Sequence, residues 1–205
     1  MQVHTIVNND FKSNTYFVEN RPYTNEVLII DPGGNEVELL NFIRSNLFEP
    51  QYILLTHEHF DHITGTNCIK QAFPDCKIIC SEKCAKGIVD PKLNLSAYYG
   101  KPYCSVYADI KVDQNGFMFY WKDIPVACFP WEGHSLGGMF FSINDVLFCG
   151  DQFIKETKTV VNLPGGNKIK VKESLTFLMN NFHVETLLYP GHGDTLKIAD
   201  IKCEF

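Results

Sequence analysis

Short apolar runs separated by Gly, Pro, Asn and Asp predict a chain in which strands and helices alternate. Four- and five-residue apolar runs predict strands at residues 27–30, 52–55, 77–80, 126–129, 139–143, 146–149 and 186–189. Apolar positions at helical spacing predict helices at about residues 35–47, 65–73, 82–88 and 172–182. Asn35 is the expected N-cap of the first helix. This order is typical of a layered α/β protein built on sheets.

Two pairs of residues predict tight turns. Asn115 and Gly116 favour a hairpin in the aromatic middle of the chain, and Asn144 and Asp145 favour a turn between two strands. No internal repeat or linker interrupts the 205 residues, so we expect one domain over residues 1–205.

Composition and charge narrow the possible partners. The chain is 45% hydrophobic and 20% charged, which is typical of a folded globular protein. A formal net charge of −6 argues against a protein that binds the phosphates of nucleic acid. No uncharged apolar stretch is long enough to span a membrane, and the first residues do not resemble a secretory signal. We therefore expect a cytoplasmic protein with no nucleic-acid or membrane partner.

The chain has 8 cysteines, and without a secretory signal we expect them to be reduced and mostly buried. Cys76, Cys80 and Cys84 are four residues apart, which raises the alternative of a metal or redox site. The Cys-x2-Cys spacing of zinc knuckles is absent, so buried thiols are the favoured interpretation.

The strongest chemical signal follows the strand at residues 52–55. There the sequence carries His57, His59, Asp61 and His62. The first three are two residues apart, so in an extended segment they point the same way. Imidazole together with carboxylate suits Zn, Fe or Mn. The segment therefore predicts a site for one or two metals.

Three further residues recur in the same setting. His134, Asp151 and His192 each follow a predicted strand within a few residues, next to glycine. Sites in open sheets lie at the C-terminal ends of strands. We therefore expect these side chains to join the first group.

The sequence His57-Glu58-His59-Phe60-Asp61-His62, followed by Gly133-His134-Ser135, Gly150-Asp151 and Pro190-Gly191-His192-Gly193, resembles the metallo-β-lactamase superfamily. Within it, the chain most resembles the glyoxalase II-like hydrolases. The resemblance implies a four-layer αββα sandwich with two divalent metals at one edge between the sheets. Zn is the expected metal, with Fe or Mn as alternatives.

The resemblance also implies a role for each residue. It assigns His57, His59 and His134 to the first metal, and Asp61, His62 and His192 to the second. Asp151 would bridge both metals, and Asp61 would accept a proton during catalysis. Asp31, in an early Asp-Pro-Gly turn, would orient one of the histidines or simply cap the turn.

The implied activity is hydrolysis of a small thioester or related ester by a metal-bridging hydroxide. Few residues follow His192, so we expect no C-terminal helical substrate domain, and recognition of glutathione stays open. Lys155 and Lys158 are weak candidates for binding an anionic substrate. The main alternative is a mononuclear iron persulfide dioxygenase. A true β-lactamase, an RNA-processing nuclease and a binding module without chemistry are less favoured, and the oligomeric state stays open.

Overall fold

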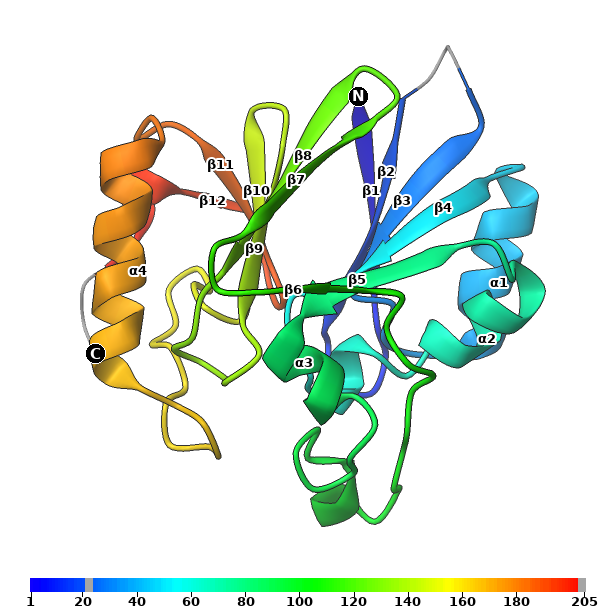
Figure 1. The fold of residues 1–205 in the computed structure, drawn as a ribbon, viewed down its shortest axis with the longest axis horizontal. Helices are drawn as coiled ribbons and strands as arrows, with labels where there is room; N and C mark the ends of the chain where they lie inside the picture. Colours follow the sequence, from blue (N-terminus) through cyan, green and yellow to red (C-terminus); the bar gives the residue numbers. More distant parts are fainter. Residues whose placement is uncertain (21–23, 203–205) are drawn as a thin grey trace.

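The structure, a computed structural model, describes residues 1–20 and 24–202, and it contains two six-stranded sheets packed face to face (Figure 1). The first sheet has the order β1-β2-β3-β4-β5-β6, with strands Gln2–Val7, Asn14–Glu19, Glu26–Ile30, Glu49–Leu54, Lys77–Ser81 and Ile110–Val112. The second sheet has the order β12-β11-β10-β9-β8-β7. Taken from β7 to β12, its strands are Phe117–Trp121, Ile124–Pro130, Met139–Ile143, Val146–Gly150, Leu187–Pro190 and Leu196–Lys197.

Helices cover the outer face of each sheet. The first sheet is covered by α1 (Glu36–Ser45), α2 (Thr66–Ala72) and α3 (Glu82–Gly87), and the second by α4 (Lys168–Asn181) (Figure 1). Three 3-10 turns complete the elements: η1 (Phe60–His62), η2 (Ser96–Tyr99) and η3 (Ile198–Asp200). The result is the four-layer αββα sandwich expected from the sequence, with parallel and antiparallel pairs in both sheets.

Three apolar cores fill the spaces between the four layers. Strand β3 shows how one strand serves two of them: Val27 and Ile29 face the helices, while Leu28 and Ile30 face the second sheet. The third core lies between the second sheet and α4. A strand buried on both faces is apolar at every position, which is why its sequence shows no alternation.

The structure confirms the predicted strands and helices, with shifts at their ends. Asn35 caps α1, and its side chain accepts hydrogen bonds from the backbone N–H groups of Val37 and Glu38 at 2.9 and 3.3 Å. Helix α4 starts earlier than predicted, after its N-cap Asn167. The first turn of α4 carries the exposed Ile169, so apolar periodicity does not mark that turn.

The predicted hairpin at Asn115 and Gly116 is wrong. The chain does turn there, and Gly116 adopts a φ of +81°. However, the turn joins β6 to β7, which belong to different sheets: β6 pairs with β5, and β7 pairs with β8. A turn sequence determines a local reversal of the chain, but it does not determine which strands then pair. The turn at Asn144, between β9 and β10, is confirmed.

Strands β1 and β2 were not predicted from the sequence. Every residue of β2 is buried, including the polar Asn14 and Thr15. These polar side chains have hydrogen-bond partners elsewhere in the chain, so burial does not leave them unpaired. The apolar part of β2 is only the three residues 16–18, between polar residues, so the sequence carries a weak signal for this strand.

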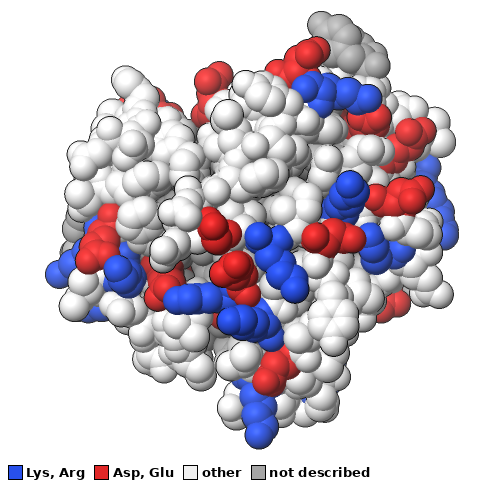
Figure 2. Space-filling model, in the orientation of Figure 1, with Lys and Arg blue, Asp and Glu red and all other residues white. Residues whose placement is uncertain are grey.

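The described cysteines are free thiols, and all of them are buried except Cys104, as predicted. Cys203 lies outside the described residues. No helix in the described ranges is both long and apolar enough to cross a membrane. On the face in Figure 2, basic side chains lie among acidic ones and do not form a continuous positive surface.

Removing a side chain from the core between the sheets should destabilise the protein strongly. Leu28 is fully buried there, so Leu28→Ala should lower the free energy of unfolding by about 2–5 kcal/mol through lost burial and a residual cavity. Denaturant unfolding measures this, with Val37→Ala, at a side chain 66% exposed, as the control that should change little. Equal losses in the two variants would contradict the assignment of the core.

Candidate metal centre

All seven predicted ligand residues come together at one edge, between the two sheets. His57, His59, Asp61 and His62 lie in the segment after β4, which includes η1. The other three come from the second sheet. His134 lies in the loop between β8 and β9, Asp151 follows β10, and His192 follows β11. Residues far apart in the sequence therefore converge because strands of both sheets end at this edge.

The first cluster consists of His57, His59 and His134. Their ring nitrogens lie within 4.8 Å of one another, and Nδ1 of His59 is 3.1 Å from Nε2 of His134. Two nitrogens bound to one tetrahedral zinc at 2.0–2.1 Å would be roughly 3.3 Å apart. The three histidines are thus spaced as ligands of a single ion.

The second cluster consists of Asp61, His62 and His192. Nε2 of His62 lies 3.3 Å from Nε2 of His192. Oδ2 of Asp61 lies 3.4 Å from each of those two nitrogens. The three donor atoms form a nearly regular triangle of the size that a second ion requires.

Asp151 lies between the two clusters. Its Oδ2 is 3.6 Å from Nε2 of His134 in the first cluster and 3.4 Å from Nε2 of His192 in the second. Its Oδ1 is 3.5 Å from Nε2 of His62. One carboxylate therefore faces both groups of histidines.

Several buried nitrogen and oxygen atoms that could bind a metal in these clusters have no hydrogen-bond partner within the described part of the chain. They include Nε2 of His57 and Oδ1 of Asp151. A buried polar atom without a partner is costly, because burial removes its contacts with water and nothing replaces them. Lone pairs of nitrogen and carboxylate oxygen that converge in this way fit a pair of divalent metals.

Hydrogen bonds on the far side of two rings fix which nitrogen faces the first cluster. Nδ1 of His134 lies 2.9 Å from the carbonyl oxygen of Val160, which can only accept, so this nitrogen carries the proton. The hydroxyl of Thr56 donates to Asp31, so it accepts from Nδ1 of His57 at 3.0 Å. In both rings the lone pair of Nε2 is left to bind a metal ion in the cluster.

Asp31 anchors the start of the same segment. Its Oδ1 accepts from the backbone N–H of Thr56 at 2.7 Å, and its Oδ2 is 3.3 Å from Nδ1 of His62. The contact with His62 agrees with an orienting role rather than a turn cap alone, and that role stays a prediction.

Burial lowers the pKa of His57, His59 and His134, in the case of His59 to about 3, so these rings are neutral at pH 7. Burial opposes protonation of the other two histidines as well. There the carboxylates of Asp61 and Asp151 outweigh it, and they raise the pKa of His62 to about 9 and of His192 to about 10. Burial opposes ionisation of both carboxyls, but the histidines lower their pKa values.

Sequence reasoning missed the residues that hold the loop of His192. The side chain of Asn14 donates to the carbonyl oxygens of Pro190 and Gly193 at 3.1 and 2.9 Å. The hydroxyl of Tyr16 donates to the same Pro190 oxygen at 2.5 Å. The Asn-Thr-Tyr sequence of β2 gave no local signal of this role.

The loops of Asp61 and His134 are held in a similar way. The Ser13 hydroxyl donates to the carbonyl oxygen of Asp61 at 2.7 Å. The side chain of Gln152 accepts from the backbone N–H of His134 at 2.9 Å. The loops of Asp61, His134 and His192 therefore each have a partner from another part of the chain.

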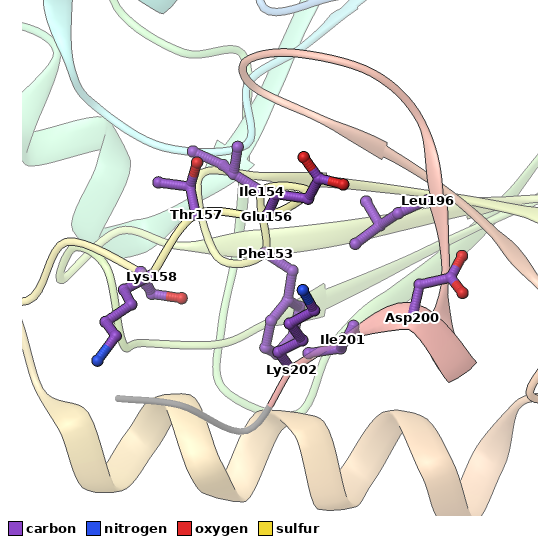
Figure 3. A pocket seen from close by; sticks show the side chains of 10 residues that line it. Phe153, Ile154, Glu156, Thr157, Lys158, Leu196, Asp200, Ile201 and Lys202 are labelled. Atoms are coloured by element: carbon purple, nitrogen blue, oxygen red, sulfur yellow. The ribbon is translucent and has the colours of Figure 1, made fainter.

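Lys155 and Lys158 are exposed, and the structure does not bring them into the clusters. Lys158 lines a pocket of about 190 Å³ between the segment after Asp151 and residues 196–202, where its side chain points away from Glu156 and Asp200 (Figure 3). None of the seven cluster residues lines this pocket. A role for either lysine in substrate binding stays a prediction.

The family model of the metallo-beta-lactamase superfamily matches residues 8–192. The chain therefore belongs to this superfamily, which is a superfamily of metallo-hydrolases. A protein of Streptococcus pyogenes serotype M6 named "Probable metallo-hydrolase" is 29% identical over 212 residues, covering 98% of this chain and 88% of that relative. Its name does not reach the level of a subfamily, so the resemblance to glyoxalase II-like hydrolases stays a prediction.

Solved structures share the fold. The BLEG-1 B3 metallo-beta-lactamase superposes with a TM-score of 0.87 at 26% identity, covering 97% of this chain and 95% of that one. The protein TTHA1623 in a di-iron-bound form gives a TM-score of 0.79 at 22% identity, covering 96% of this chain and 95% of that one.

The close approach of Gly33 to the segment of the second cluster gives a test. A Cβ atom at Gly33 would lie 1.8 Å from the carbonyl oxygen of Asp61, so Gly33→Ala must displace that backbone. We expect metal affinity to fall about 10- to 100-fold, as is typical when the surroundings of ligands are disturbed. Competition with a chelator measures it.

Gly100→Ala is the matched control. A Cβ there meets no atom within 4 Å, and the φ of +71° costs only stability, about 1 kcal/mol. If both variants bind metal as the wild type does, Gly33 does not position Asp61.

Proposed function

We propose that this protein is a hydrolase that works with two divalent metals, one at each cluster, with Asp151 as the shared ligand. The observation that carries the proposal is the placement of the Asp151 carboxylate 3.6 Å from His134 and 3.4 Å from His192, which belong to different clusters. One carboxylate between two complete sets of three donors is the arrangement expected of a two-metal site.

Zn is the proposed metal, with Fe or Mn as alternatives, because imidazole and carboxylate ligands suit all three. The di-iron-bound form of TTHA1623 supports two ions on this fold and keeps iron as an option. A cytoplasmic location and the lack of a nucleic-acid partner are further parts of the proposal, and they rest on the sequence.

The bound metals would lower the pKa of a shared water towards 7 and stabilise negative charge on the substrate oxygen. The chain contributes the remaining parts. The histidines and Asp151 would hold the ions. Asp61 faces His62 and His192 through Oδ2, so Oδ1 is the proposed acceptor of the water proton. Burial of His57, His59 and His134 limits the access of other water to the first cluster.

A small thioester is the proposed substrate. Across the described residues, the carboxylates of Asp61 and Asp151 form their ion pairs with histidines, and no lysine or arginine pairs with them. The site thus lacks an evident acid for a poor leaving group. A thiolate, whose conjugate acid has a pKa near 8.5, leaves without such help.

A cleft beside Asp61 supports a small-molecule substrate. It has a volume of about 550 Å³, within the usual range for such sites, and its walls include Phe11, Phe60 and Lys101. The rings of Phe11 and Phe60 are in edge contact, with centroids 4.9 Å apart. This wall would accept an apolar part of the substrate.

Lactam hydrolysis is the second candidate, because the BLEG-1 B3 metallo-beta-lactamase is 26% identical over nearly the whole chain. The same pair of metals could attack a strained lactam carbonyl. We rank it second because a lactam nitrogen is a poorer leaving group than a thiolate, and the site lacks an evident acid for it.

Removal of the shared ligand tests the two-metal proposal. Asp151→Ala should remain folded but retain about one metal per chain instead of two, with a turnover at least about a hundredfold lower. Elemental analysis of protein purified without chelator gives the metal content. Asp145→Ala, which removes an exposed turn carboxylate, is the control and should behave as the wild type. A single iron in the wild type would instead favour the persulfide dioxygenase.

The substrate proposal predicts measurable hydrolysis of lactoylglutathione and little hydrolysis of penicillins or structured RNA by the zinc-loaded protein. We expect a KM near or above about 1 mM, because Lys155 and Lys158, the predicted anion-binding residues, do not lie in the clusters. Rates with all three substrates, measured on one preparation, decide between the candidates. Faster turnover of penicillins than of thioesters would overturn the ranking, and oxygen uptake with glutathione persulfide would favour the dioxygenase.

A further inference from the structure

Glu58 lies between two proposed ligands, His57 and His59, and its side chain points away from solvent. The residue is 5% exposed. Its Oε2 accepts hydrogen bonds from the Ser135 hydroxyl and from the backbone N–H of Gly137, both at 3.1 Å. The carboxylate therefore joins the segment after β4 of the first sheet to the loop that carries His134 in the second.

The surroundings leave room for this carboxylate only because two neighbours are glycines. A Cβ atom at Gly137 would lie 2.4 Å from Oε2 of Glu58, and one at Gly87 would lie 2.6 Å from its Cβ and Cγ. The carbonyl oxygen of Gly137 also accepts from the Ser81 hydroxyl at 2.8 Å. The two loops thus meet around the Glu58 side chain.

The hydrogen bonds to the Glu58 carboxylate come from a hydroxyl and a backbone amide, and Glu58 forms no ion pair with a residue in the described ranges. A buried carboxylate held only by neutral donors is expensive to keep, and apolar packing would stabilise the fold at lower cost. Its two-sided attachment indicates a role in setting the distance between the loops.

We propose that Glu58 is a positioning residue that sets the geometry of the cluster of His57, His59 and His134. This inference rests on the proposed metal-dependent function. The second cluster is held by other contacts, from Ser13 to Asp61 and from Asn14 to the His192 loop. Loss of Glu58 should therefore affect the first cluster selectively.

The test measures Co²⁺ binding, with titration giving the affinity for each ion and visible absorption giving the spectrum of the bound ion. Glu58→Ala should lower the affinity for one of the two Co²⁺ ions about 10- to 100-fold and alter the spectrum of that ion, while the other ion binds as in the wild type. His134→Ala and His192→Ala provide the spectra of each cluster disabled in turn, so the weakened ion can be assigned.

Conservative variants separate positioning from folding. Glu58→Gln keeps an oxygen that can accept from Gly137, so it should restore most of the affinity that Glu58→Ala loses. Ser135→Ala removes one donor from the opposite loop and should weaken the same ion more mildly. Leu178→Ala, at a fully buried residue of α4, should lower the melting temperature without changing either affinity.

The inference is overturned if Glu58→Ala and Ser135→Ala both bind two Co²⁺ ions with wild-type affinity and spectra. It is also overturned if Glu58→Ala, or Glu58→Gln should the alanine variant not fold, weakens both ions equally. A wild-type protein that binds neither Co²⁺ nor Zn²⁺ would instead overturn the proposed function itself, a result that does not depend on any variant.

Discussion

Histidines and carboxylates packed against one another in a buried edge are the constraint on which the rest of the structure depends. Nitrogen and oxygen atoms of the two clusters approach to between 3.1 and 3.6 Å, and some have no hydrogen-bond partner within the described chain. Such groups would separate or admit water unless the loops carrying them were fixed. The sandwich supplies that fixation, because both sheets end at this edge and three apolar cores hold the layers together.

Buried polar contacts turn this edge into a site of defined geometry. The start of β2 is central, because Ser13, just before the strand, reaches the backbone of Asp61, while Asn14 and Tyr16 reach the loop of His192. One short segment of the first sheet thus holds ligands from both sheets. Polar residues in a buried strand are costly unless they have hydrogen-bond partners. Here the hydrogen bonds that satisfy these side chains are also the ones that hold the loops in place.

The two ligand clusters and the surfaces around them bear on different properties, the type of reaction and the choice of substrate. In the proposed function the clusters would account for the class of chemistry, since two bound ions would supply a hydroxide that can attack many activated carbonyl groups. Selectivity would then come from the surrounding segments, such as the cleft wall at Phe11 and Phe60, against which the ring of Tyr99 packs with centroids about 5 Å apart. Those segments come from three different parts of the chain, so substrate preference can differ among proteins that share the same ligands.

The sequence by itself determined the α/β class, most of the strands and helices, and the histidine-rich segment at residues 57–62, because apolar runs and closely spaced ligands are local signals. The αββα sandwich and the grouping of His134, Asp151 and His192 with that segment drew on the resemblance to the superfamily. The sequence did not reveal β1 and β2, or the sheet in which β7 pairs, because their partners are distant along the chain. Only the tertiary structure decided that Asp151 faces both clusters, and that Glu58, an unremarkable position in the sequence, touches the loop of His134. These facts depend on how two sheets pack, and packing is a property of the whole chain.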